Sequence, residues 1–219
     1  FLSRDAETGG GVHNGRAAYP LWYRCRRENT LEGQGDPIAD PENGDQFILW
    51  ESNTVFSGSW FWNGLDVKPV DEMVEHYYAT VGRGSTFLAN FAPDPRGLMT
   101  EKVLSHASAF GDRVRSFNEQ GLAETAGAGP SITLKLPSSV AVDHIVTMED
   151  LCEGQKIAAY KIEARQEDGT WSEVVSGESV GHKRIDRFPK TRTDALRFTC
   201  THSFADPVHI RRFAAFGLD

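Results

Sequence analysis

Residues 67–91, VKPVDEMVEHYYATVGRGSTFLANF, join a helical pattern to an apolar strand pattern. Over 67–81 the apolar side chains recur every three or four residues, which predicts a helix with one buried face. Pro69 suits the first turn of this helix, and Gly82 is typical of its end. The run 85–93 is mostly apolar, as in strands of parallel sheets that are covered on both faces.

The same alternation extends to both sides of this stretch. Residues 46–50 predict a short strand upstream, and residues 101–118 predict a second helix downstream, with Thr100 as its N-cap. The order strand, helix, strand, helix predicts βα units on a parallel sheet. The preceding segment, 1–48, is rich in Gly, Asn, Asp and Pro, which is typical of long loops.

The sequence changes character after this helical stretch. Residues 121–130, GLAETAGAGP, are small and predict a linker between two domains. From Ser131 onward, short runs alternate apolar and polar residues, and Asp168-Gly169 is a hairpin signal. Short strands with frequent turns predict a β-sandwich of the jelly-roll type over 131–219.

The composition excludes several classes of function. The chain has 219 residues, of which 39% are hydrophobic and 25% charged, as in ordinary globular proteins. A net charge of −8 disfavours nucleic-acid binding, and no apolar run approaches the roughly 20 residues of a membrane span. Cys25, Cys152 and Cys200 form no C-x-x-C spacing, which argues against a zinc or thioredoxin-type site. We therefore expect no metal or other cofactor. The sequence does not decide whether Cys152 and Cys200 form a disulfide.

The length of the N-terminal part limits what it can form alone. A complete (β/α)8 barrel needs about 250 residues and eight βα units, whereas residues 1–120 supply about three. A partial barrel would expose strand edges and half of its core to water. We therefore expect residues 1–120 to be the C-terminal part of such a barrel, packed against a missing segment of the same gene product or of a second chain. The alternative is that these residues form a small α/β domain by themselves.

Several motifs then follow in a characteristic order: Trp50-Glu51-Ser52-Asn53, Ser59-Trp60-Phe61-Trp62, Tyr77-Tyr78-x-x-Val81-Gly82-Arg83, and Asn90-x-x-Pro93-Asp94-x-Arg96-Gly97. This order resembles the last barrel segments of family 29 glycoside hydrolases, the α-L-fucosidases. Farther on, Gly181-His182-Lys183-Arg184-Ile185 is similar to the galactose-binding-like C-terminal sandwich of the subgroup that cleaves α-1,3/1,4-linked fucose. The resemblance covers nearly the whole chain.

The resemblance implies a retaining hydrolysis of α-L-fucosyl linkages in fucosylated glycans. An Asp nucleophile and a second carboxyl, about 5–5.5 Å apart, carry out such a reaction. In the family the nucleophile usually belongs to a Trp-x-Asp-Gly motif, which this sequence lacks. The resemblance therefore places the nucleophile outside this chain, and it implies that this chain alone is inactive. It also suggests a secreted or lysosome-like location.

The acid/base residue has more than one candidate. In the related subgroup it occupies a Gly-Asn-Glu-like position, which aligns with Gly15 after Asn14, and glycine has no proton to transfer. Glu7 takes this position if the loop is shifted. Glu51 is the other candidate, expected at the C-terminal end of a barrel strand, where barrel active sites are built. It is then the acid/base or a carboxylate that binds sugar hydroxyls, and the plain alternative is a paired surface glutamate.

Other residues are candidates for sugar binding. Trp60 and Trp62 suit the apolar face of a sugar ring, or they fill the core. His13 and Asn14, in the glycine-rich loop, are candidates for contacts with substrate hydroxyls. By contrast, we expect structural roles for His76 and His106.

Three functions remain open from the sequence. The first is an active α-L-fucosidase once the missing half is present. The second is a catalytically inactive fucosidase-like protein that binds glycans or has a structural role. The third is sugar binding by residues 131–219 as a carbohydrate-binding module, although a fold of this kind does not settle function.

Overall fold

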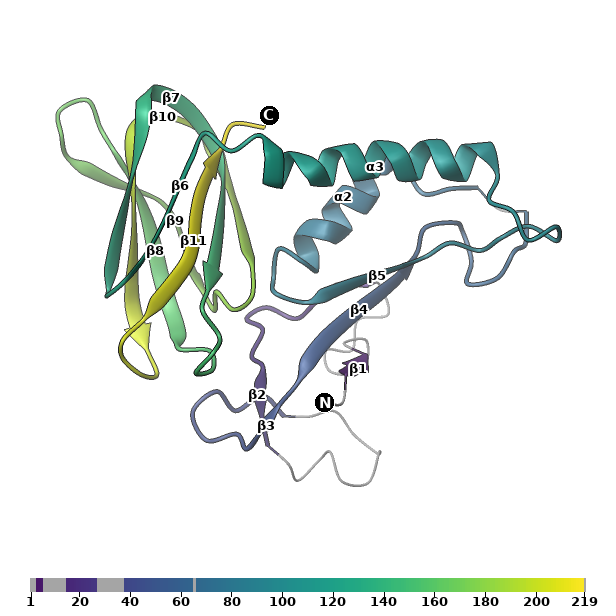
Figure 1. Ribbon diagram of the computed structural model, residues 1–219, viewed down its shortest axis with the longest axis horizontal. Coiled ribbons are helices and arrows are strands. Elements are labelled where there is room, and N and C mark those ends of the chain that lie inside the picture. Colours follow the sequence, from purple (N-terminus) through teal and green to yellow (C-terminus); the bar gives the residue numbers. More distant parts are fainter. Residues whose placement is uncertain (1–2, 6–14, 27–37, 65, 219) are drawn as a thin grey trace.

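The computed structural model describes residues 3–5, 15–26, 38–64 and 66–218. Figure 1 shows a lobe of strands and two helices beside a lobe made of strands only. The first, here called the N-terminal lobe, contains β1 (Ser3–Asp5), β2 (Arg24–Cys25), β3 (Gln46–Phe47), β4 (Leu49–Val55), α2 (Val70–Ala79), β5 (Thr86–Asn90) and α3 (Glu101–Glu119). The second, the C-terminal lobe, contains β6 (Ala123–Ala128), β7 (Ser131–Glu149), β8 (Ile157–Arg165), β9 (Trp171–Glu178), β10 (Arg184–Ser203) and β11 (His209–Phe216).

The N-terminal lobe is built on a three-stranded sheet of order β1-β4-β5, and both of its pairings are parallel. Its helices match the predicted ones closely, and Thr100 caps α3 by accepting a hydrogen bond from the Val103 amide at 3.4 Å. The strand predicted over 46–50 ends too early, because β4 extends beyond Trp50. The hydrogen-bonded pairing with β5 continues past Trp50 to Val55.

The two faces of this parallel sheet differ. Phe87 of β5 points toward the helices, where its ring contacts Phe110 of α3 at a centroid distance of 6.2 Å. Because strand side chains alternate between faces, Leu88 points to the opposite face, and it is 48% exposed. Leu49 of β4 is equally exposed at 48%. The helices therefore cover one face of the sheet, and large apolar side chains on the other face remain open to solvent.

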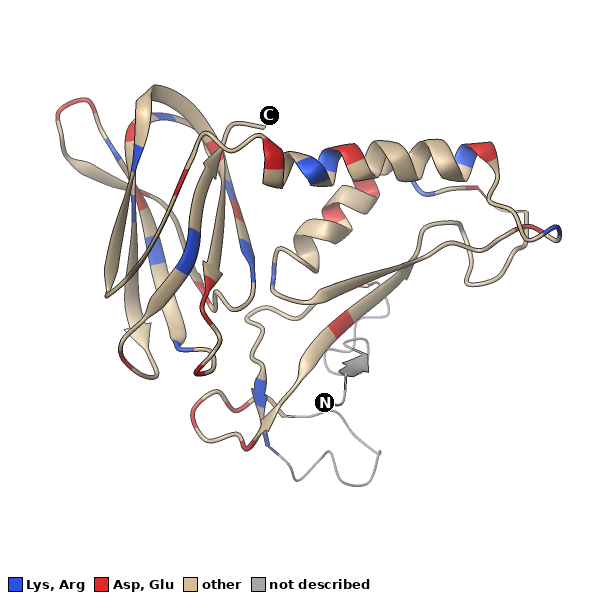
Figure 2. Ribbon diagram, in the orientation of Figure 1, with Lys and Arg blue, Asp and Glu red and all other residues tan. Residues whose placement is uncertain are grey.

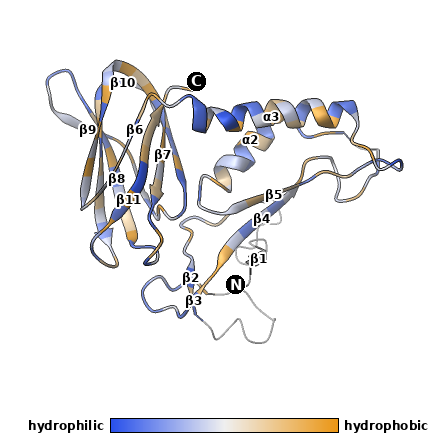
Figure 3. Cartoon of the chain, in the orientation of Figure 1, coloured by the Kyte–Doolittle hydropathy of each residue, from blue (hydrophilic) through white to orange (hydrophobic). Residues whose placement is uncertain are grey.

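The C-terminal lobe is a six-stranded antiparallel sheet of order β6-β11-β7-β10-β8-β9. Its long strands β7 and β10 shift register twice against each other, after Arg187 and after Thr193. Hydrophobic residues recur along these strands (Figure 3). They form one core that includes Tyr160, Leu196, Phe198 and Phe213, all at most 1% exposed.

The segment 121–130 is not an irregular linker. Residues Ala123–Ala128 form β6, which pairs antiparallel with β11 from Ala123↔Ala215 to Ala128↔His209. Small side chains suggested flexibility, but they suit an outer strand whose backbone hydrogen bonds hold it to the sheet. The passage from one lobe to the other is therefore short and ordered.

A shared apolar cluster joins the lobes. Tyr77 of α2 and Phe117 of α3 pack with residues of the C-terminal lobe, among them Val146, Ile185 and Phe216. Polar contacts cross the same junction: Lys183 donates to the Tyr77 hydroxyl at 3.1 Å. The amide of His182 likewise donates to the hydroxyl of the buried Tyr23 at 3.1 Å. The two lobes therefore share buried surface.

Candidate functional site

The candidate site lies where β4 and β5 end, at the carboxyl edge of the parallel sheet. The chain leaves β4 at Phe56, whose amide donates to the Asn90 carbonyl at 2.8 Å. It then makes an excursion that an antiparallel bridge between Ser57 and Val67 closes at its base. In α/β folds with parallel strands, ligands bind beyond the carboxyl ends of the strands. This excursion, residues 57–67, is called the edge loop below.

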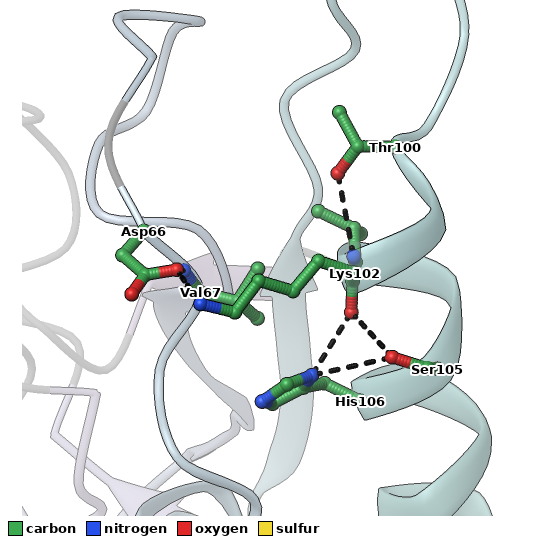
Figure 4. Close-up of polar contacts among 7 residues, drawn as sticks. Asp66, Val67, Thr100, Lys102, Ser105 and His106 are labelled. Carbon is green, nitrogen blue, oxygen red and sulfur yellow. Dashed lines mark hydrogen bonds and ion pairs between the residues drawn. The ribbon is translucent and has the colours of Figure 1, made fainter.

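Polar contacts attach the edge loop to the first turn of α3 (Figure 4). The Asp66 carboxylate accepts from Lys102 of α3, and it also accepts from the Val67 amide at 2.9 Å. Lys102 is itself part of the turn that Thr100 caps. The Lys102 hydrogen bond is the first cause of a lowered pKa of Asp66, which keeps the carboxylate ionised.

The edge loop presents three consecutive aromatic residues to solvent. Trp60 is 46% exposed, Phe61 83% and Trp62 38%. Asn90, at the end of β5, donates from its side-chain amide to the Trp60 carbonyl at 3.0 Å and so ties the loop to the sheet. The core interpretation of the two tryptophans is therefore wrong for this chain, because large aromatic surface stays accessible. Sequence reasoning did not single out Phe61 or Asn90, although both belong to the motifs that carried the resemblance.

Glu51 does not lie at the carboxyl edge. It is the third residue of the seven-residue strand β4, four residues before Val55, which is roughly 13 Å along a strand. The expectation failed because the sequence predicted that the strand ends at Trp50. Its pairing partners are Asp5 and Thr86 on the neighbouring strands. By alternation it shares the open face of the sheet with Leu49, and it is partly exposed.

The glycine-rich loop gives a mixed result. Glu7, His13 and Asn14 lie outside the described residues. Gly15 has a φ of +60°, and a Cβ there would meet the Asn53 carbonyl oxygen at 2.5 Å and the Thr54 Cβ at 2.6 Å. No side chain fits at Gly15, because its backbone packs directly against β4.

The histidines of the helices have structural partners. His76 is 4% exposed, lies with Nδ1 3.3 Å from the Gly15 carbonyl, and stacks near Phe87. Burial lowers its pKa, so it is neutral near pH 7. His106 places Nδ1 2.9 Å from the Lys102 carbonyl of its own helix. Neither geometry points to catalysis by these two residues.

The turn after β5 is fixed by an ion pair. Asp94 accepts from the Arg96 guanidinium at 2.9 and 2.6 Å, and from the Arg96 amide at 2.8 Å. This guanidinium is the main cause of a pKa of Asp94 below its usual value. Asp94 therefore stays ionised and shapes the segment beside the edge loop, next to the stacked pair Phe56 and Phe91 at 4.5 Å.

No sequence pattern pointed to the buried carboxyl group in the C-terminal lobe. Glu149 is 1% exposed, and burial raises its pKa to about 7. A pKa near neutrality suits an acid/base catalyst, but its oxygens already accept from the amides of Lys156, Ile157 and Gly181 at 2.5 to 3.3 Å. Glu149 therefore holds the turn after β7 to the loop before β10. The three cysteines are free thiols, so Cys152 and Cys200 are not paired.

Comparisons with known proteins agree with the resemblance. The chain is 25% identical to α-L-fucosidase 1 of Arabidopsis thaliana over 90% of its own length and 47% of the relative. A second curated relative, from Oryza sativa subsp. japonica and also assigned as an α-L-fucosidase 1, is 22% identical and covered to 46%. The chain thus spans about half the length of the curated relatives it matches. None of the protein-family models matches the sequence.

Solved structures give the same result for the fold. A Bacteroides thetaiotaomicron protein assigned to the α-L-fucosidases aligns over 99% of this chain and 51% of its own, with a TM-score of 0.87 and 30% identity. A family 29 fucosidase of Ruminococcus gnavus in complex with fucose shares the fold, with a TM-score of 0.82 at 19% identity over 99% of this chain. The resemblance to family 29 α-L-fucosidases is therefore confirmed over nearly the whole chain, which corresponds to about half of those proteins. In the part of the chain that the structure describes, no helix has the length and apolar character of a membrane span.

Proposed function

We propose that this chain is part of a retaining α-L-fucosidase that acts on fucosylated glycans. In this proposal residues 1–120 supply the last strands of the catalytic (β/α)8 barrel, and residues 131–219 form a galactose-binding-like β-sandwich beside it. The observation that carries the proposal is the 99% structural coverage at 30% identity by a relative assigned to the α-L-fucosidases.

The open face of the parallel sheet supports the barrel assignment. In a closed barrel, helices cover the outer face and bulky side chains fill the interior. Here the helices lie on one face only, and Leu49 and Leu88 lie on the other, each 48% exposed. Among the described residues, no further strand pairs with the outer edges of β1 and β5. Additional strands at both edges would close the barrel and bury this face.

The attacking carboxylate is then assigned to the remainder of the barrel. The sequence contains no Trp-x-Asp-Gly motif, and the chain matches only 47% of the Arabidopsis relative. We place the nucleophile on a segment outside this chain, in the same gene product or in a second chain. Glu51 faces the open side about four residues below the edge, which favours a supporting carboxylate over the proton-transferring one.

The edge loop is the proposed contribution of this chain to substrate binding. Trp60 and Trp62 are exposed, held by Asn90 and Asp66, and located beyond the carboxyl ends of the strands. The apolar C–H face of fucose suits stacking on an indole ring. His13 and Asn14 remain proposed hydroxyl contacts from the glycine-rich loop.

A second candidate function is a catalytically inactive relative that binds glycans. The observation in its favour is Gly15, which aligns with the acid/base position of the related subgroup and has no room for a side chain. Glu7 then becomes the only acid/base candidate of that loop.

The test is hydrolysis of an aryl α-L-fucoside by the full-length protein, with its remaining barrel segment. We expect turnover, and we expect Trp60→Ala to lower kcat/KM at least about tenfold, a loss of about 1.4 kcal/mol of transition-state stabilisation. Trp171→Ala is the matched control, since Trp171 lies on β9 in the C-terminal lobe under the Arg197 guanidinium. A folded full-length protein that binds fucose without turnover would instead establish the inactive relative.

A further inference from the structure

A polar hollow at the junction of the lobes gathers an unusual number of arginines. It has a volume of about 350 Å³, and its wall includes four arginines and two carboxylates: Arg16, Arg83, Arg184, Arg187, Glu75 and Asp186. The wall of the hollow therefore carries an excess of positive charge, whereas the whole chain has a net charge of −8. Elsewhere, acidic and basic residues are scattered over both lobes (Figure 2).

Two of these arginines are neutralised within the protein. Arg184 donates from Nε to the buried Asp186 carboxylate at 2.8 Å. Arg187 donates to both carboxylate oxygens of Glu75, at 2.6 and 2.9 Å. These ion pairs account for both carboxylates of the hollow.

The other two arginines lack such a counter-charge. Arg83 donates from Nη1 to the neutral Ala17 carbonyl at 2.7 Å. Neither Arg83 nor the exposed Arg16 forms an ion pair with a carboxylate of the described residues. Burial, and then the charges of Arg184 and Arg16, lower the pKa of Arg83. Like charges thus face one another across the hollow.

Aromatic rings hold several of these guanidinium groups in place. The Tyr19 ring lies beneath both Arg83 and Arg184, with centroid distances of 5.9 and 4.2 Å. Arg187 lies over the Tyr78 ring at 4.0 Å. Guanidinium groups held in fixed planes are well suited to bind the oxygens of an anion through paired hydrogen bonds.

We propose that this hollow binds a tetrahedral oxyanion, sulfate or phosphate, with Arg16 and Arg83 as its principal ligands. The site is separate from the edge loop. Ala79 ends α2 and Arg83 precedes β5, so the hollow lies at the amino end of β5, whereas the edge loop follows the carboxyl end of β4. The inference does not depend on the fucosidase proposal.

Calorimetric titration of the folded chain with sodium sulfate tests the proposal. Chloride at matched ionic strength corrects for general salt effects, because sulfate also stabilises proteins by exclusion from their surface. We expect saturable binding of sulfate, about tenfold weaker binding in Arg16→Gln, and no detectable binding in Arg16→Glu. Arg115→Glu is the control, since Arg115 is exposed on α3 and does not line the hollow.

The source of the oxyanion is resolved by a second titration. Galactose 6-sulfate is compared with galactose and with inorganic phosphate. Binding of the sulfated sugar that exceeds binding of free sulfate indicates an esterified glycan, and stronger binding of the inorganic ions indicates a free anion. The proposal is overturned if none of these anions binds, or if Arg16→Glu binds them as tightly as the unaltered chain.

Discussion

The C-terminal lobe buries its core within itself, whereas the N-terminal lobe leaves one face of its sheet uncovered. Two leucines in the middle of strands show the difference: Leu196 of β10 is 0% exposed, and Leu88 of β5 is 48% exposed. The six antiparallel strands of the C-terminal lobe pack around one shared core, whereas a parallel sheet needs cover on both faces. The comparison teaches that the C-terminal lobe encloses its own core, whereas the N-terminal lobe leaves apolar side chains of its sheet exposed.

The largest expected effect separates these two leucines directly. We predict that Leu196→Ala lowers the free energy of unfolding by about 3 to 5 kcal/mol, because it leaves a cavity in a closed core. Leu88→Ala removes the same atoms from an open face, so we expect a loss below about 1 kcal/mol. Urea unfolding followed by circular dichroism measures both variants.

The same pair of variants sharpens the barrel proposal when the remaining barrel segment is present. Leu88→Ala is then expected to become costly, since its side chain would lie in a filled interior. Equal losses for Leu196→Ala and Leu88→Ala in this chain alone would show that the open face is already covered in solution, and the contrast between the lobes would be incorrect.

The next effect concerns the junction at which the lobes meet. Lys183 is 6% exposed, and its burial, followed by the charges of Arg212 and Arg211, lowers its pKa to about 8 from 10.5. Between these two pH values the unfolded chain binds more protons than the folded chain, so the free energy of unfolding rises with pH. Below pH 8 the lysine is charged in both states and the full penalty of burying it remains.

Lys183→Met removes this titration while keeping a side chain of similar length. We predict that the unaltered protein gains roughly 2 to 3 kcal/mol relative to Lys183→Met as pH rises from about 8 to about 10.5. Taking the difference between the two proteins cancels the titration of Tyr77 and Tyr23, whose pKa values burial raises to about 12. A difference that does not change with pH would mean that Lys183 is solvated and that the junction opens at this point.

The sequence predicted the regular parts of the fold for reasons that are local. Helical periodicity located α3 to within one residue and α2 to within three, and the Asp168-Gly169 hairpin signal lies in the turn between β8 and β9, where Gly169 has a φ of +83°. These features depend on contacts within a few residues. The prediction of a linker over 121–130 failed because these small residues form a strand by pairing with β11, which lies far along the chain.

The site was less predictable because it depends on long-range pairing. Glu51 was expected at the carboxyl edge, and its true place follows from hydrogen bonds between β4 and β5 that no local pattern encodes. The exposure of Trp60 and Trp62 likewise follows from the closure of the edge loop at Ser57 and Val67. The arginine hollow combines residues from both lobes. Arg16 and Arg187 both line it although they lie far apart in the sequence, so no local pattern could predict the hollow.

The smallest predicted effect concerns the N-cap of α3, which begins beside the edge loop in the N-terminal lobe. Thr100 accepts a hydrogen bond from the Val103 amide at 3.4 Å, a long distance for a cap. We predict that Thr100→Ala lowers the free energy of unfolding by about 0.5 to 1 kcal/mol, the low end for an N-cap. Ser105→Ala, one turn later, is the matched control, because the exposed Ser105 hydroxyl contacts groups of its own helix, the Lys102 carbonyl and His106 Nδ1. Since the apolar cluster around Phe117 joins α3 to the C-terminal lobe, the loss is expected to appear in a single unfolding transition. Two separate transitions, of which Thr100→Ala shifts only one, would show that the lobes unfold independently despite their shared cluster.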